Sequence, residues 1–214
     1  MSHSQALFTQ QLDAYVAAGY DDLVDLTESE FRARLEPLRT VLDRAVADGL
    51  ALDSSADHVP FVVVVTSRVV PPEARVSRLR VPGSDREGAI DPGHRDGLAA
   101  YRPIPGLPLP AAEAYLLVDV DRGDTLREIA ADDALRAIAA TNRSPLTLDE
   151  GLSLATVHPL ALEADAGFLL AGSRHRRRVP ALWVTAGGAM LGWGGGATPE
   201  AWLGVASAAA RVAP

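Results

Sequence analysis

Apolar side chains recur with a helical period at the start of the chain. Residues 5–18 place them three or four positions apart, and the run stops at Gly19. The apolar positions are Leu7, Phe8, Leu12, Tyr15 and Val16. This spacing predicts an amphipathic helix that ends at the glycine.

A capping box marks the start of a longer helical run. Thr27 and Glu30 have the spacing at which a threonine side chain accepts from the third helical N–H while the glutamate reaches back. Pro37 lies inside the run that follows and should kink it or divide it in two. We therefore predict a helical lobe over residues 1–52 and a main domain over residues 53–214.

The pattern changes to strands and turns after the helical run. Residues 60–66 are a continuous β-branched run, which favours a buried strand, and further strands are predicted over residues 74–81 and 114–119. Residues 147–150 (Thr-Leu-Asp-Glu) form a second capping box and should open a helix. The segment 84–101 has no clear period and is too long for an ordinary connection, so we predict a lid there.

Two adjacent glycines near the C-terminus predict a tight hairpin. Gly187 and Gly188 lie between apolar runs, and a two-residue turn needs the positive φ that glycine adopts readily. Counting outward from that turn places Trp183 opposite Gly192. Trp183 and Trp193 then point to opposite faces of the sheet, and we interpret both as core residues.

The same hairpin should bring a basic loop and a glycine-rich turn to one edge of the sheet, because antiparallel pairing sets the start of one strand beside the end of the other. Thr198 is predicted to cap a helix that begins at Pro199. If the first strand of the hairpin extends back through the arginines, Arg176 and Arg178 should share one side of it, with Arg177 on the other. The predicted ligand-binding residues are Ser173, Arg174, His175, Arg176, Arg177, Arg178, Gly194, Gly195, Gly196 and Thr198.

Guanidinium groups beside a helix N-terminus suit a phosphate, sulfate or carboxylate. A carboxylate at Glu200 would compete with such an anion for the donors. The alternative interpretation is an arginine cluster that is neutralised by nearby acids on a solvated surface.

Composition narrows the classes of function. The 214 residues carry a formal net charge of −8, which argues against nucleic acid as a partner. The sequence has no lysine and no cysteine, which excludes Schiff-base catalysis, a P-loop lysine, thiol catalysis and disulfides. Neither a secretory signal nor an apolar run of membrane-spanning length is visible, so we expect a cytoplasmic protein without a membrane partner.

Three acids that follow a predicted strand suggest a metal site at first sight. Asp119, Asp121 and Asp124 are close enough in sequence to bind Mg²⁺ or Ca²⁺. Turn and helix-capping roles account for all three, so no metal is predicted. Residues 192–197 fit a relaxed dinucleotide fingerprint, but no second parallel strand or ribose-binding acid follows them, so no cofactor is predicted either.

Several phrases of the sequence resemble an uncharacterised protein family of GC-rich, actinobacterial-type genomes. They are residues 115–123 (YLLVDVDRG), 143–151 (RSPLTLDEG), 172–174 with 178–183, and 191–193 with 202–204. The resemblance spans most of the chain and implies no assigned activity. Members of that family often carry Cys in the arginine loop and Cys and His around the final tryptophans, where this chain has His175, Gly194 and Glu200. A thiol or metal function of those residues would be absent or altered here.

Together these patterns predict an α+β fold: a mainly antiparallel sheet with packed helices and an N-terminal helical lobe. The favoured hypothesis for function is the binding of a small anionic molecule at the arginine loop. Its rival is an interaction protein whose arginines contact an acidic protein partner without forming a pocket. A weaker alternative is an enzyme that uses His175 or Asp121 as acid or base.

Overall fold

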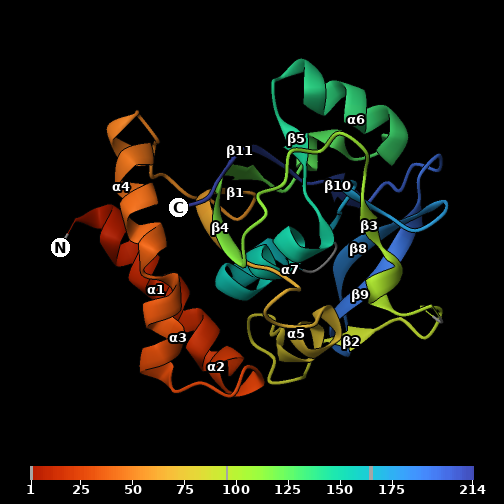
Figure 1. Ribbon diagram of the computed structural model, residues 1–214. Coiled ribbons are helices and arrows are strands. Elements are labelled where there is room, and N and C mark those ends of the chain that lie inside the picture. Colours follow the sequence, from red (N-terminus) through yellow and green to blue (C-terminus); the bar gives the residue numbers. More distant parts are fainter. Residues whose placement is uncertain (1, 95, 164–165) are drawn as a thin grey trace.

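Helices pack against two β-sheets in an α+β architecture (Figure 1). The structure is a computed structural model and describes residues 2–94, 96–163 and 166–214. One sheet has the strand order β1-β4-β11-β5 and the other β10-β6-β8-β9-β2. Antiparallel pairs dominate, and only β10–β6 and β2–β9 are parallel among the described strands. The predicted fold class is confirmed.

The N-terminal helices follow the predicted pattern. They are α1 (His3–Ala17), α2 (Tyr20–Leu23), α3 (Glu28–Leu35) and α4 (Pro37–Ala47). Both halves of the capping box between Thr27 and Glu30 are present. Pro37 takes the first turn of α4, where its missing N–H is harmless, so it separates α3 from α4 as predicted.

Strands and shorter helices make up the rest of the chain. The first sheet contains β1 (His58–Val65), β4 (Ala114–Asp121), β5 (Ser144–Pro145) and β11 (Ser207–Val212). The second contains β2 (Ala89–Ile90), β6 (Gly167–Leu169), β8 (Arg178–Thr185), β9 (Gly188–Gly195) and β10 (Leu203–Val205). A separate pair joins β3 (Arg102–Pro103) to β7 (Ser173–Arg174). The helices are α5 (Pro72–Arg78), α6 (Ala131–Ala140) and α7 (Leu148–Val157), with short 3-10 turns at Leu98–Ala100, Asp124–Leu126 and Pro159–Ala161.

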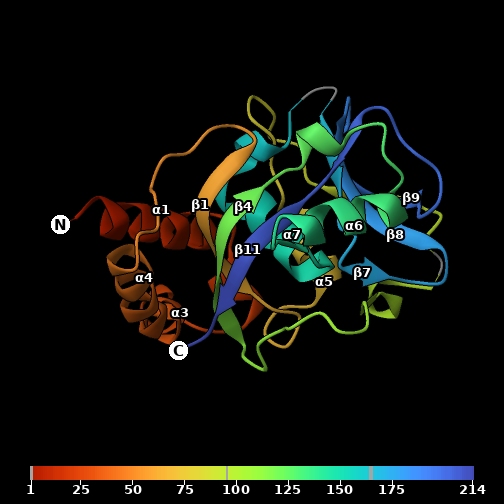
Figure 2. The same ribbon diagram turned by 90° about the horizontal axis from the view of Figure 1, so that it is seen from above.

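Helix α1 completes the edge of the first sheet. Gln11 uses both ends of its amide on β1: Nε2 donates to the Phe61 carbonyl and Oε1 accepts from the Val63 N–H, each at 2.8 Å. Tyr15 Oη also donates to the Val63 carbonyl, at 2.5 Å. These side chains satisfy backbone groups that would otherwise be unpaired, because β1 is an edge strand. Figure 2 shows β1, β4 and β11 side by side, with α1 and α4 on one side of them.

The predicted strand over residues 74–81 is wrong, because α5 occupies residues 72–78. Pro72 lies in the first turn of this helix, a position that suits proline. The helix also buries the Arg75 side chain, which donates to Asp149 Oδ1 at 2.8 Å and to Ser153 Oγ at 2.9 Å in α7. A buried guanidinium group needs several hydrogen-bond acceptors, and α5 places the Arg75 side chain beside these acceptors in α7.

The predicted helix after Thr198 is also wrong. Residues 203–205 and 207–212 form β10 and β11 instead. Strand β10 pairs in parallel with β6, and β11 pairs with β4 and β5. The small apolar residues of this segment are compatible with either state, and the free strand edges decide between them.

The C-terminal hairpin forms in a register two residues away from the predicted one. Thr185 pairs with Gly188, so the turn is made by Ala186 and Gly187, and Trp183 lies opposite Met190 instead of Gly192. An even shift leaves every side chain on its predicted face, because strand side chains alternate with a period of two.

The two tryptophans of the hairpin point to opposite faces, as predicted. Trp183 covers Gly192, where a Cβ would collide with its ring, and it meets Trp202 edge-on. Trp193 contacts His94 on the other face, with ring centroids 4.9 Å apart. Both tryptophans are half-buried, so the hairpin is covered on both sides.

Candidate functional site

A tight turn presents the arginine loop. The backbones of His175 and Arg178 exchange hydrogen bonds of 3.1 and 2.9 Å, which puts Arg176 and Arg177 at the tip of a small hairpin between β7 and β8. The condition for the predicted alternation of Arg176 and Arg178 against Arg177 is not met, because β8 begins only at Arg178. Arg176 has a φ of 56°, in the region that favours glycine.

Three arginines of this segment line a hollow of about 400 Å³, which we call the arginine hollow. Its lining residues are Asp132, Arg174, Arg176, Arg177, Gly196 and Ala197. The basic loop meets the glycine-rich turn directly, as predicted, because the Gly196 N–H donates to the Arg177 carbonyl at 3.1 Å. Arg174 pairs with Asp132 at 2.6 Å. Within the part of the chain that the structure describes, Arg176 and Arg177 make no ion pair.

The helix that faces the arginine hollow is α6. The Asp132 N–H, in the first turn of α6, donates to the Gly196 carbonyl at 2.9 Å. The Asp132 carboxylate lies at the same positive end of the helix dipole. Thr198 caps no helix, and its N–H donates to the Gly195 carbonyl at 3.4 Å in a turn. Because the Asp132 carboxylate lies at the N-terminus of α6 and Thr198 caps no helix, an anion in the arginine hollow would be attracted by the guanidinium groups.

Two of the predicted binding residues are engaged elsewhere. Ser173 is buried, and its Oγ accepts from the Leu148 N–H at the start of α7, at 2.9 Å. His175 Nε2 lies 2.9 Å from Asp96 Oδ2, in the segment that we predicted as a lid. Ser173 thus has a structural role, and His175 ties the arginine loop to residues 84–101.

Arg178 and Gly194 also lie outside the lining of the arginine hollow. The Arg178 guanidinium lies over the Trp193 ring, 4.2 Å from the ring centroid, and donates to the Gly93 carbonyl at 3.0 Å. Such a cation–π contact holds the charge on the sheet surface. Gly194 is buried against Leu169, which a Cβ would approach to 2.9 Å.

The acids of residues 119–124 have separate roles. Asp121 Oδ1 accepts from the Gly123 N–H at 2.6 Å, and Asp124 binds the Arg122 guanidinium through both carboxylate oxygens. A turn-stabilising role is therefore confirmed for Asp121. The capping role predicted for Asp124 is wrong, because Gly123 holds the N-cap position of the 3-10 turn and the Asp124 carboxylate forms an ion pair with Arg122 instead. The turn role predicted for Asp119 is wrong, because its carboxylate pairs with His58 and Arg143.

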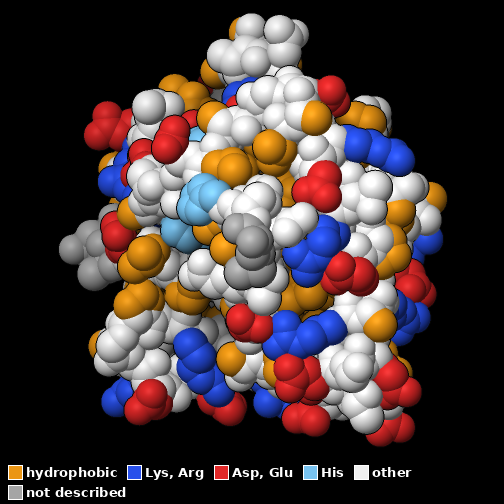
Figure 3. Space-filling model, turned by 90° about the vertical axis from the view of Figure 1, so that its left-hand side faces the viewer, with side chains coloured by type: hydrophobic (Ala, Val, Ile, Leu, Met, Phe, Trp, Pro, Cys, Tyr) orange, Lys and Arg blue, Asp and Glu red, His pale blue; other side chains and the backbone are white. Residues whose placement is uncertain are grey.

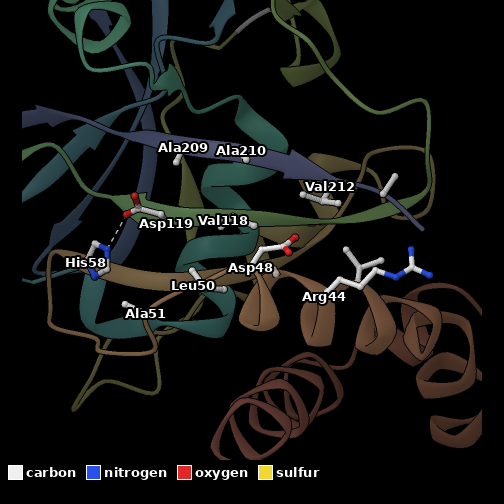
Figure 4. A pocket seen from close by; sticks show the side chains of 14 residues that line it. Arg44, Asp48, Leu50, Ala51, His58, Val118, Asp119, Ala209, Ala210 and Val212 are labelled. Atoms are coloured by element: carbon white, nitrogen blue, oxygen red, sulfur yellow. Dashed lines mark hydrogen bonds and ion pairs between the residues drawn. The ribbon is translucent and has the colours of Figure 1, made fainter.

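Sequence reasoning missed a second hollow, which lies between α4 and the outer face of the first sheet (Figure 4). It measures about 790 Å³, and we call it the α4 cleft. His58 and Asp119 lie at one end of it, joined by a hydrogen bond of 2.8 Å. These residues are 61 positions apart, so only the pairing of β1 with β4 brings them together.

Comparisons with known proteins give a family but no activity. The sequence profile of DUF5701, a family of unknown function, matches residues 14–214. No curated protein and no solved structure matches the chain. Within the described residues, every helix is too short or too polar to cross a membrane.

Proposed function

We propose that this chain, which belongs to the DUF5701 family of unknown function, binds a small anionic molecule in the arginine hollow. The charge of the hollow carries the proposal. Three guanidinium groups line it together with a single carboxylate, that of Asp132. This local positive excess lies on a chain whose formal net charge is −8.

The geometry assigns different roles to the arginines. Arg174 is held in place by its ion pair with Asp132, and its side chain is only 19% exposed. Arg176 and Arg177 lie exposed at the tip of the turn, where their donors are free to form a fork around an anion. A concave lining favours a compact ligand such as a phosphate, sulfate or carboxylate over an extended acidic protein surface.

Isothermal calorimetry with inorganic phosphate tests this proposal. We expect salt-sensitive binding that weakens roughly tenfold or more in Arg176→Ala and in Arg177→Ala, because each loses a charge-assisted contact worth about 1.5–3 kcal/mol. Arg136→Ala is the matched control, since Arg136 is exposed on α6 and lies outside the hollow.

Two results would contradict the proposal. One is the absence of phosphate binding, and the other is equal weakening by all three substitutions. Either result would favour the rival hypothesis, in which the arginines form a diffuse surface that contacts an acidic protein partner.

A further inference from the structure

The α4 cleft has an apolar floor that its own side chains do not fill. Ala209 and Ala210 of β11 line the cleft beside Val118 of β4 (Figure 4), and alanine side chains fill little of the space between the sheet and α4. Val212 continues the floor and is 37% exposed, which is unusual for a large apolar side chain next to a core. Figure 3 shows hydrophobic side chains gathered among charged ones on the side of the molecule that carries the N-terminal helices.

The polar end of the cleft is a chain of three charged or titratable groups. His58 Nε2 lies 2.8 Å from Asp119 Oδ1, and Arg143 Nη1 donates to Asp119 Oδ2 at 2.8 Å. Because the carboxylate can only accept, Nε2 carries the proton, and Nδ1 of the neutral ring is left as an acceptor. Among the described residues, no donor reaches Nδ1.

Asp119 has an unusual backbone for a strand residue. Its φ is 53°, in the left-handed region that non-glycine residues seldom adopt, although Asp does so more readily than most. The β1 register sets it beside Pro60, which has no N–H to donate, and Arg143 Nη2 donates to the Asp119 carbonyl at 2.6 Å instead. Strained residues that their surroundings hold in place are common at functional sites.

Charges around the cleft cancel. The Asp119 carboxylate is matched by Arg143, and Arg44 and Asp48 bring one charge of each sign to the α4 wall. A charged ligand would therefore gain little attraction and would lose its hydration. An uncharged ligand with a large apolar surface loses less.

We propose that the α4 cleft is a second binding site, which takes a small uncharged organic molecule with an apolar body and a hydroxyl group. The apolar body lies over Ala209, Ala210 and Val118. The hydroxyl donates to Nδ1 of His58, whose ring is held by Asp119 and Arg143. This site shares no residue with the arginine hollow, so the two proposals stand or fall separately.

The uncharged dye Nile red, whose fluorescence rises in apolar surroundings, tests the location of the site. We expect saturable fluorescence enhancement that is lost in Ala210→Trp, because the indole covers the apolar surface on which the dye would lie. Ala137→Trp is the matched control, since Ala137 is also exposed but lies on α6 outside the cleft. Equal enhancement by both variants and by the unsubstituted protein, or no enhancement at all, would overturn the proposal.

Displacement of the dye by 2-naphthol and by naphthalene tests the role of His58. The two molecules differ only in the hydroxyl, so 2-naphthol should displace the dye at a roughly two- to twelvefold lower concentration, the effect of one net hydrogen bond. The difference should vanish in His58→Phe, which keeps a planar ring at this position and removes the acceptor. A preference for 2-naphthol that persists in His58→Phe, or no preference in the unsubstituted protein, would rule out the assigned hydrogen bond.

Discussion

At the scale of single residues, Arg176 combines backbone strain with charge. A φ of 56° is costly for arginine and easy for glycine. Arg176→Gly should therefore keep or raise the free energy of unfolding, by up to about 1 kcal/mol, while it weakens phosphate binding. Urea unfolding and calorimetry on the same variant measure both quantities.

Arg177→Gly provides the comparison, because the φ of Arg177 is not positive and glycine there only adds freedom to the unfolded chain. It should lower the free energy of unfolding. If Arg176→Gly is destabilised as much as Arg177→Gly, the turn does not strain Arg176.

The Asp119 carboxyl should make the free energy of unfolding depend on pH in the acid range. Burial alone would raise the pKa of its carboxyl, but the hydrogen bond from His58 and the charge of Arg143 outweigh burial and hold the pKa below its usual value. A depressed pKa contributes stability above the pKa of the unfolded chain, and that contribution is lost as the pH falls through the folded pKa.

We therefore expect Asp119→Asn to lose less stability than the unsubstituted protein between pH 6 and about pH 3, since Asp in unfolded chains titrates near pH 3.9. Urea unfolding at the two pH values gives the comparison, with Asp53→Asn at an exposed side chain as control. Parallel losses in Asp119→Asn and the unsubstituted protein would show that Asp119 is not responsible for acid sensitivity.

At the scale of elements, the two capping boxes share a motif but differ in burial. Thr27 and Glu30 are exposed, whereas Thr147 is buried and Glu150 is fully buried. Glu150 also binds Arg211 and accepts from Tyr115 Oη at 2.7 Å. Water can replace a lost cap at the first site but not at the second.

Thr147→Ala should therefore cost about 1–2 kcal/mol of stability and Thr27→Ala less than about 1 kcal/mol. Urea unfolding of both variants measures the difference. Equal losses would mean that burial does not add to the value of the cap.

Local signals in the sequence predicted some elements correctly and others wrongly, for physical reasons. Thr27, Thr147 and Pro37 act through neighbours in sequence, so their helix boundaries were predictable. The strand assigned to residues 74–81 failed because α5 buries Arg75 against distant acceptors in α7. The helix assigned after Thr198 failed because free edges of β4 and β6 recruit that segment as strands.

At the scale of the whole molecule, the arginine hollow was partly predictable and the α4 cleft was not. The hairpin rule places the arginine loop beside Gly196 whatever the exact register, since both lie at one sheet edge. The approach of α6, with Asp132 at the hollow, depends on tertiary packing. His58, Asp119 and Arg143 meet only through sheet pairing, and no spacing in the sequence marks them.

The central claim is that a small anion binds in the arginine hollow, and backbone amide chemical shifts test it most directly. Titration of the labelled protein with inorganic phosphate should give saturable shifts that are largest at Arg176, Arg177, Gly196 and Ala197. Arg136 and the residues of the α4 cleft should barely shift. Shifts that do not saturate, or that are largest away from the arginine hollow, would contradict the claim.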